Sequence, residues 1–418
     1  MKIIYFHQYF NTPEMAGGTR SYEVAKRLVA AGHEVHMITS IRETASSNGE
    51  WHNTKEAGIS VHWYPVPYSN NMNYTRRILA FFQFAVAAWR YASQIDGDLV
   101  FATSTPLTIA IPAVLVSRKK KIPMVFEVRD LWPELPIAMG ALKNPVLRMM
   151  ARLLEKWAYK HSEAIVALSP GMKKGIVETG YKSERVAVIP NSSDNEDFAV
   201  DASQIDKFRL ERSYIRPTEP MLIYAGTFGK INGVSYMVRL AKEFAKIGSN
   251  IQILLIGDGL EKELVVTEAK SSGVLGRNLF IEDSIPKSQI PFLFGCASMA
   301  STLFIDLPEM RANSANKFFD TLASGTPVMI NFGGWMHDLV VKYECGISVW
   351  NMSIEDAAYK LHRSLNDKGW LSASGANAKY LAVHQFDRGE LAGQIEQVME
   401  LVLNNQADRV STIADGQY

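Results

Sequence analysis

The chain has 418 residues and a mass of 46.7 kDa, which is long for one domain and favours two. Its hydrophobic fraction of 47% and charged fraction of 21% are ordinary for a globular protein. A formal net charge of +1 provides no overall attraction to nucleic acid. We therefore expect two globular domains and no nucleic-acid partner.

The two cysteines, Cys296 and Cys345, show no metal-ligand spacing, which indicates a reducing compartment and argues against a structural zinc site. The apolar run at residues 3–6 follows Met1-Lys2 directly, unlike the apolar core and cleavage site of a signal peptide. No run in the sequence approaches the roughly 20 apolar residues that span a bilayer. These features predict a cytoplasmic protein.

Short apolar runs alternate with helical patterns along the chain. In the first half we expect strands at residues 3–6, 35–38, 61–64, 99–101, 124–127, 164–168 and 186–189, and helices at residues 19–31, 74–93, 107–117 and 144–160. Turn residues at 190–194 and the charged stretch 201–220 indicate a boundary between lobes. The alternation then restarts, with strands at residues 221–225, 251–256, 279–282, 299–303, 328–331 and 347–350 and helices at residues 233–247, 261–272, 287–294 and 315–325.

Strands that alternate with helices are typical of the α/β class, in which helices cover a mostly parallel sheet. The sequence therefore predicts two doubly wound, Rossmann-like lobes in tandem, at residues 1–190 and 191–383. Ligands bind at the carboxyl ends of the strands in such sheets, so we expect the lobes to face each other across a ligand-binding cleft.

The segment 306–328 fits a phosphate site. A polar loop that ends at Ser314 leads into the expected helix 315–325, whose N-terminus presents free N–H groups and a positive dipole end. Lys317 in the first turn is unfavourable for the helix unless an anion accompanies it. Asp320 could accept hydrogen bonds from a ribose. The alternative is a surface helix that carries one acid and one base.

A glycine pair, Gly17-Gly18, stands before the expected helix 19–31. Glycines there would let the backbone approach an anion closely. The same pair is also ordinary turn chemistry, so both interpretations stay open.

The motif Glu127-Val128-Arg129-Asp130-Leu131-Trp132-Pro133-Glu134 begins at the carboxyl end of the expected strand 124–127, where substrates bind. Arg129 could bind a phosphate or carboxylate through two hydrogen bonds. Asp130 or Glu127 could accept a hydroxyl proton. The alternative is a buried Arg–Asp ion pair that holds the loop.

The expected helices 74–93 and 144–160 are amphipathic, basic and rich in large apolar residues. The first carries Arg76, Arg77 and Arg90, and the second carries Arg148, Arg152, Lys156 and Lys160. Cationic helices of this kind can lie in a membrane interface. The alternative is that each helix packs on the core and turns a basic face to solvent.

In chain order the sequence contains Gly17-Gly18, Ile189-Pro190-Asn191, Ala225-Gly226, Ile256-Gly257-Asp258-Gly259 and the run from Phe319 to Val328. Their order and spacing resemble the GT-B glycosyltransferases, and more narrowly the retaining glycosyltransferase family 4, over essentially the whole chain. The motif from Arg129 to Glu134 is similar to a bacterial subgroup that builds O-antigen and capsule repeat units and includes N-acetyl-fucosaminyl transferases. The resemblance implies that a helix at residues 384–410 crosses back to the first lobe. A tail of residues 411–418 follows, and we expect disorder from Ala407 onward.

The resemblance also implies which residues bind the donor. Family members bind the nucleotide ribose with the second of two glutamates eight residues apart; Asp320 stands at the second position, Ala312 at the first, and Glu309 is the nearest acid. An arginine and a lysine that usually bind the diphosphate are replaced by Thr227 and Asn232. We therefore expect donor contacts from Gly17, Gly18, Thr227, Lys230, Asn232, Glu309, Ser314, Asn316, Lys317 and Asp320, and catalytic roles for Glu127, Arg129, Asp130 and Lys317.

The implied reaction is transfer of a sugar, such as an N-acetylated deoxyhexose, from a UDP-linked donor to a polyprenyl-diphosphate-linked saccharide in O-antigen or capsule biosynthesis, with retention of configuration. The fold type that the chain resembles does not usually hold a catalytic metal, and we expect neither a metal nor another cofactor. The acceptor would reach the protein at the inner-membrane surface through the helices 74–93 and 144–160. Two alternatives stay open, namely a catalytically inactive sugar-nucleotide-binding scaffold of a polysaccharide assembly complex and a UDP-sugar epimerase.

Overall fold

The computed structural model describes residues 1–15, 17–41, 49–67, 72 and 74–414. The chain divides into two compact units. Unit 1 contains residues 1–190 and 389–418, and unit 2 contains residues 191–388. The chain therefore returns to unit 1 after Arg388, later than the expected residue 384.

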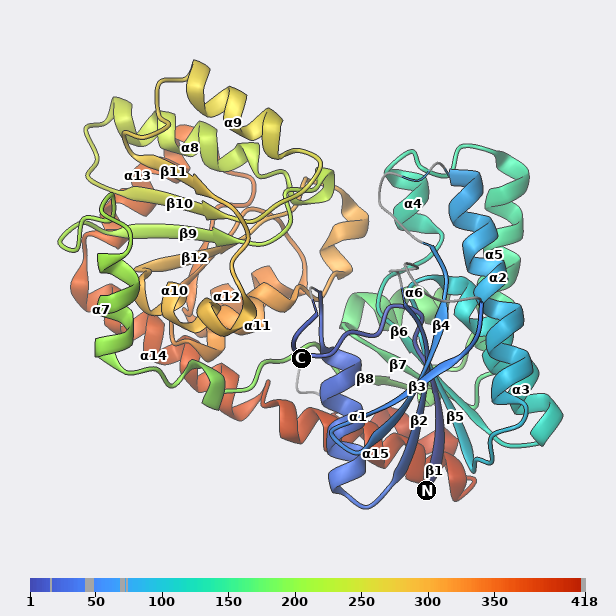
Figure 1. Cartoon of the computed structure of the whole chain (residues 1–418). Helices are drawn as coiled ribbons and strands as arrows, with labels where there is room; N and C mark the ends of the chain where they lie inside the picture. Colours follow the sequence, from blue (N-terminus) through green and yellow to red (C-terminus); the bar gives the residue numbers. More distant parts are fainter. Residues whose placement is uncertain (16, 42–48, 68–71, 73, 415–418) are drawn as a thin grey trace. The chain divides into compact units, whose positions relative to one another are not determined.

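Unit 1 is built around an eight-stranded sheet with the order β3-β4-β2-β1-β5-β6-β7-β8 (Figure 1). The strands are β1 (Lys2–Phe6), β2 (Glu34–Ile41), β3 (His52–Glu56), β4 (Ile59–Pro65), β5 (Leu99–Thr103), β6 (Met124–Val128), β7 (Ala164–Ala167) and β8 (Val186–Val188). Only β3 and β4 pair antiparallel, whereas the other neighbours pair parallel. Every residue of β5, β6 and β7 is buried, which explains why these strands are almost entirely apolar; Thr103 of β5 and Glu127 of β6 are the polar exceptions.

Helices cover both faces of this sheet. They are α1 (Arg20–Ala30), α2 (Tyr74–Ala92), α3 (Ala110–Lys120), α4 (Glu134–Ala138), α5 (Pro145–Lys160), α6 (Pro170–Glu178) and α15 (Arg388–Leu403). In Figure 1, α2, α3 and α5 lie on one side of the sheet and α1 and α15 on the other. The start of α5 is set by Asn144, whose side chain accepts hydrogen bonds from two backbone N–H groups, and by Pro145 at the first helical position.

Unit 2 contains a six-stranded parallel sheet with the order β11-β10-β9-β12-β13-β14. Its strands are β9 (Met221–Ala225), β10 (Gln252–Ile256), β11 (Leu279–Glu282), β12 (Met299–Thr302), β13 (Val328–Ile330) and β14 (Gly346–Ser348). Its helices are α7 (Ala202–Leu210), α8 (Ser235–Lys246), α9 (Lys262–Ser271), α10 (Ile290–Cys296), α11 (Asn316–Ala323), α12 (Trp335–Tyr343), α13 (Ile354–Leu365) and α14 (Lys368–His384). Buried apolar clusters fill both faces of the sheet, one formed with α8, α9 and α13 and the other with α7 and α10.

Each sheet has a point at which the strand order reverses. In unit 1 it lies between β1 and β5, and in unit 2 between β9 and β12. Ligands of doubly wound sheets bind beyond the carboxyl ends of the strands at such points. The α/β class with two doubly wound units is therefore confirmed, and a ligand site is expected at each of the two reversal points.

The C-terminal prediction is wrong in part. Residues Ala407–Thr412 form a short 3-10 helix instead of a disordered tail. Val410 is buried, and Asp408 accepts a hydrogen bond of 2.5 Å from Arg185. These contacts involve residues far apart in the sequence, so local composition did not reveal them. Residues 415–418 of the expected tail lie outside the described residues.

Candidate functional site

The first turn of α11 and the loop after β9 form a polar site in unit 2. Nζ of Lys317 donates a hydrogen bond of 3.0 Å to the hydroxyl of Tyr224 and lies 4.3 Å from the centre of its ring. The same hydroxyl donates a hydrogen bond of 2.7 Å to the carbonyl oxygen of Thr227. Tyr224 therefore joins two of the predicted donor residues beside the point where the strand order reverses.

Gly226 makes room for this lysine. Its φ is +153°, and a Cβ atom at this position would lie 2.9 Å from Nζ of Lys317. The loop itself lies against Gly257, where a Cβ atom would be 1.9 Å from the carbonyl oxygen of Gly226. Any side chain at either position would separate the loop from its neighbours, so the glycines are needed for the close approach of backbone and ammonium.

Burial makes the charged form of the Lys317 ammonium less favourable than it is in water. Burial lowers the pKa of Lys317 to about 8, and the charge of Asp320 opposes this shift. Among the described residues, no carboxylate oxygen lies within 4.0 Å of its Nζ. A bound anion would provide the missing partner, and Lys317 stands in the first turn of α11, at the helix end whose free N–H groups can bind phosphate.

Ser314 and Asp320 are held by the segment at which unit 2 begins. The backbone N–H of Asn191 donates to Oγ of Ser314 at 3.2 Å, and the hydroxyl of Ser193 donates to Oδ1 of Asp320. Burial raises the pKa of Asp320, whereas the hydrogen bond from Ser193 and the charge of Arg388 lower it. Asp320 lies three residues after Lys317 on α11, so both side chains project from the same face of the helix.

The remaining predicted donor residues lie nearby in the chain but are not all joined to this group. Thr227, Lys230 and Asn316 are exposed, and Asn232 is buried. In the part of the chain that the structure describes, Oε2 of Glu309 is buried without a hydrogen-bond partner. The donor roles of Lys230, Asn232 and Glu309 stay predictions.

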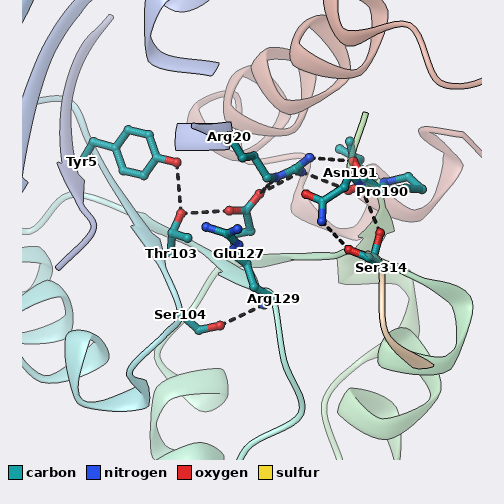
Figure 2. Close-up of polar contacts among 10 residues, drawn as sticks. Tyr5, Arg20, Thr103, Ser104, Glu127, Arg129, Pro190, Asn191 and Ser314 are labelled. Carbon is teal, nitrogen blue, oxygen red and sulfur yellow. Dashed lines mark hydrogen bonds and ion pairs between the residues drawn. The ribbon is translucent and has the colours of Figure 1, made fainter. Parts of the chain in front are cut away.

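Glu127 of unit 1 is fully buried at the carboxyl end of β6 (Figure 2). Its Oε1 accepts a hydrogen bond of 2.9 Å from Nε of Arg20, and its Oε2 accepts one of 3.0 Å from the hydroxyl of Thr103. Arg20 also donates to the carbonyl oxygens of Ile189 and Pro190, at 3.1 and 2.6 Å. Both carboxylate oxygens of Glu127 therefore have partners, and the carboxylate orients Arg20. Arg20 in turn fixes Ile189 and Pro190, the last residues of unit 1 before the chain enters unit 2.

Arg129 and Asp130 are positioned by the loop after the neighbouring strand, β5. The backbone N–H of Arg129 donates to Oγ of Ser104 at 2.9 Å, and Oγ1 of Thr105 donates to Oδ2 of Asp130 at 3.2 Å. Thr105 has a φ of +100°, which is rare for a β-branched residue. Burial raises the pKa of Asp130, and the charge of Arg129 and the hydrogen bond from Thr105 lower it. A carboxylate with a raised pKa beside an arginine can orient a hydroxyl and accept its proton.

The predicted glycine loop precedes α1. Gly17 has a φ of +137°, and a Cβ atom there would lie 2.6 Å from Nδ2 of Asn11. The carbonyl oxygen of Gly18 accepts a hydrogen bond of 3.4 Å from the same Asn11 amide. The pair therefore shapes a turn against Asn11, and its contact with a donor stays a prediction.

Sequence reasoning missed Arg20, Thr105 and Tyr224. Arg20 is the first residue of α1, and an arginine two residues after the Gly17-Gly18 pair was the signal that could have identified it. Tyr224 carries a polar hydroxyl near the end of an otherwise apolar strand, which indicates a buried hydroxyl with a partner. For Thr105 no pattern in the sequence indicated the unusual backbone conformation.

Comparison with known proteins shows what the chain is similar to. Residues 16–192 match the family described as glycosyl transferase 4-like domain. The 2-deoxystreptamine glucosyltransferase of Streptomyces kanamyceticus is 22% identical over 51% of this chain and 54% of its own, so the match spans about half the length of that relative. WcaI of Escherichia coli (strain K12), described as a colanic acid biosynthesis glycosyl transferase, is 20% identical over 67% of this chain and 71% of its own.

Solved structures extend the likeness over the whole chain. Sucrose-phosphate synthase from Thermosynechococcus elongatus has a TM-score of 0.78 at 16% identity and covers 97% of this chain and 99% of its own. HepE from Anabaena, in complex with UDP-glucose, has a TM-score of 0.70 at 16% identity and covers 96% of this chain and 99% of its own. These solved structures share the fold of this chain, with two Rossmann-like α/β units, and within unit 1 the chain is similar to a glycosyl transferase 4-like domain.

Proposed function

We propose that this protein is a retaining glycosyltransferase that moves a sugar from a UDP-linked donor to a polyprenyl-diphosphate-linked saccharide in O-antigen or capsule biosynthesis. The observation that carries the proposal is the ammonium of Lys317, which is desolvated in the first turn of α11 with a phenol as its hydrogen-bond acceptor. A diphosphate would neutralise this charge, and the free N–H groups of α11 would bind its oxygens. The complex of HepE with UDP-glucose supports a UDP-linked donor on this fold.

The geometry of α11 suits departure of a nucleotide diphosphate. As the glycosidic bond breaks, negative charge accumulates on the β-phosphate, and donors fixed in advance around that oxygen stabilise the transition state. Lys317 and the N-terminal N–H groups of α11 would provide those donors, while Asp320 would accept hydrogen bonds from the ribose. In a single front-face displacement, which retains configuration, the acceptor hydroxyl would attack from the face that the phosphate leaves, and a phosphate oxygen would take the hydroxyl proton.

Unit 1 would bind the acceptor through the loop after β6. Arg129 has a guanidinium that can bind the phosphate of a lipid diphosphate with two hydrogen bonds. Asp130, oriented by Thr105, would hold the acceptor hydroxyl. Glu127 would act indirectly, because Arg20 and Thr103 use both of its oxygens.

Two helices of unit 1 support contact with a membrane. On α5 the large apolar side chains of Val146, Met149, Met150 and Leu153 are exposed, and on α2 those of Leu79, Phe82 and Val86. Arg148, Arg152 and Lys156 line a surface groove of α5 together with Met149 and Leu153. No helix in the described ranges is both long and apolar enough to cross a bilayer. An interface of exposed apolar and cationic side chains fits the surface of an anionic membrane, where a polyprenyl-linked acceptor would be found.

The proposal is tested by thermal unfolding with a panel of nucleotides and nucleotide sugars. A ligand at 100 times its Kd adds about 2.7 kcal/mol of stability, and we expect UDP to raise Tm more than GDP or ADP. Lys317→Ala should abolish the shift, whereas Lys242→Ala, an exposed lysine on α8, should keep it. No shift with any nucleotide would overturn the proposal.

Further measurements on the same protein distinguish the transferase from the two alternatives, an inactive scaffold and an epimerase. A UDP shift without transfer to a purified lipid-linked acceptor would favour an inactive scaffold. Conversion of a UDP-sugar to its epimer without any acceptor would favour an epimerase. Transfer with retained anomeric configuration, seen by proton NMR of the product, is the result that we expect.

A further inference from the structure

We propose that Asn191 and Ser193, in the segment where the chain enters unit 2, are positioning residues for α11. Asn191 would fix the end of the helix that binds phosphate, and Ser193 would fix the carboxylate that binds ribose. The inference rests on the proposed function, because it takes α11 as the donor site.

Asn191 makes two hydrogen bonds to the residue that directs α11 (Figure 2). Its backbone N–H donates to Oγ of Ser314 at 3.2 Å, and its Nδ2 donates to the carbonyl oxygen of Ser314 at 2.5 Å. Both residues are buried, at 4% and 5% exposure. Ser314 directly precedes Ala315 at the N-cap position of α11, so the two hydrogen bonds fix where the first turn begins.

The N-terminus of α11 is left open for a ligand. Its N-cap residue is Ala315, and no side chain caps the helix there. The first N–H groups of a helix have no partner within the helix and usually bind a Ser, Thr, Asn or Asp side chain at the N-cap. With alanine in that place, another group must supply the alignment that a cap normally gives, and Asn191 does so from outside the helix.

Asn191 also carries an unused acceptor. The carbonyl oxygen of Ser314 can only accept, so Nδ2 of Asn191 must face it and Oδ1 must point elsewhere. Among the described residues this buried Oδ1 has no hydrogen-bond partner. A buried amide oxygen without a partner destabilises a fold. A hydroxyl of the donor is the kind of group that would satisfy it.

Ser193 holds Asp320 from the same segment. It is 3% exposed, and its hydroxyl donates to Oδ1 of Asp320. That bond leaves Oδ2 for the two hydroxyls of a ribose and fixes the rotamer in which it is presented. The segment is held in turn by Arg388, which donates to the carbonyl oxygen of Ser192 at 2.6 Å and to Oδ2 of Asp194 at 2.5 Å. One short stretch thus places both the phosphate end and the ribose carboxylate of α11.

The test uses the full chain with Asn191→Ala, Ser193→Ala and Ser193→Thr, and Asn195→Ala as the matched control. Asn195 lies in the same segment, but its amide donates to the carbonyl oxygen of Ala382 and to Asp387 instead of α11. Calorimetric titration measures Kd for UDP and for 2′-deoxy-UDP. We expect Asn191→Ala to raise Kd for UDP roughly tenfold, as loss of an aligning hydrogen bond would, and Asn195→Ala to leave it unchanged.

Ser193 has a readout of its own. Ser193→Ala should weaken UDP more than 2′-deoxy-UDP, so that the preference for the ribose falls, and Ser193→Thr should restore it because threonine keeps the hydroxyl. This variant also keeps the inference testable if Asn191→Ala does not fold.

The outcomes separate the inference from the proposed function. No binding of any nucleotide to the wild-type protein would overturn both. Binding by the wild type with unchanged Kd in Asn191→Ala and Ser193→Ala would overturn the inference alone. An equal loss in Asn195→Ala would also overturn it, because the segment would then act only through general stability.

Discussion

The hydroxyl of Tyr224 is shared between Lys317 and the loop after β9. It accepts from Nζ of Lys317 at 3.0 Å and donates to the carbonyl oxygen of Thr227 at 2.7 Å. Burial raises the pKa of Tyr224, so the phenol keeps its proton at every physiological pH and can serve in both roles. The side chain of Tyr224, which the sequence patterns did not indicate, thus links Lys317 to the loop that contains Thr227.

Tyr224→Phe should separate the two hydrogen bonds of the hydroxyl from the packing of the ring. Phenylalanine keeps the ring but removes the acceptor of Lys317 and the donor to Thr227, so we expect a loss of about 1–2 kcal/mol in unfolding free energy. We also expect roughly tenfold weaker UDP binding, because Lys317 loses its alignment. Denaturant unfolding and calorimetry measure the two effects.

Tyr236→Phe is the matched control. Among the described residues the Tyr236 hydroxyl is buried without a hydrogen-bond partner, so its removal should be neutral or stabilising. Equal UDP affinity in Tyr224→Phe and the wild type would contradict a role of the phenol in the site.

The pH dependence of donor binding should follow Lys317. Burial lowers its pKa to about 8, and only the protonated form attracts a diphosphate. Above that pH the Kd of a UDP-sugar should rise by about tenfold per pH unit. Lys317→Arg should remove this dependence, since a guanidinium stays protonated. An identical pH profile in both proteins would show that another group controls binding.

The stability of the free protein should move in the opposite direction. In the unfolded chain the pKa of Lys317 is 10.5, so between about pH 8 and 10.5 the unfolded state binds the extra proton. The contribution of this group to unfolding free energy therefore rises with pH through that window. Comparison with Lys317→Met, which cannot titrate, isolates the effect in denaturant unfolding at several pH values.

The architecture was predictable because buried parallel strands are continuous apolar runs. Residues 221–225 and 251–256, for example, were expected as strands and contain β9 and β10. The strand β3 was missed because His52–Glu56 is polar and lies at the sheet edge, where it pairs antiparallel with β4. The short helices α4 and α6 have too few turns for a periodic pattern to show.

The candidate site was predictable only where local sequence carries the chemistry. Lys317 and Asp320 could be identified because both stand on one turn of one helix. The partners that orient them, Tyr224 and Ser193, lie 93 and 127 residues away in the chain. Glu127 shows the converse, because its place in the motif indicated proton transfer while the distant Arg20 takes its Oε1. Long-range hydrogen bonds of this kind leave no mark on spacing.

The backbone conformation of Thr105 lowers the stability of unit 1, whereas its hydroxyl is expected to support activity. Its φ of +100° is unfavourable for a β-branched residue, and such strain costs of order 1–3 kcal/mol. Thr105→Gly should relieve the strain and raise unfolding free energy by roughly 1 kcal/mol, part of the gain being lost to the greater freedom of glycine in the unfolded chain. It should lower turnover, because Asp130 loses its hydrogen bond. Urea unfolding and single-turnover transfer measure the pair of effects.

Thr105→Ser serves as the control, since it keeps the hydroxyl. We expect it to retain most of the turnover. If Thr105→Gly were as active as Thr105→Ser, the hydrogen bond to Asp130 would have no part in the reaction.

The outward face of α5 should determine membrane binding. Leu153, Lys156 and Lys160 are exposed, whereas Glu155, Ala158 and Tyr159 are buried. Lys156→Glu with Lys160→Glu reverses charge without touching the buried face, and each cation near an anionic surface contributes about 1 kcal/mol. We expect the double variant to bind vesicles of anionic phospholipid at least tenfold more weakly in a flotation assay, and the wild-type binding to fall with added salt. Leu153→Ser should weaken binding independently of salt, because it removes apolar contact.

The control for net charge is Lys242→Glu with Lys270→Glu, at two exposed lysines of unit 2. It makes the same change in net charge and should leave binding intact. Equal loss in both double variants would mean that net charge alone drives association, and no loss in the α5 variants would place the membrane contact on another face.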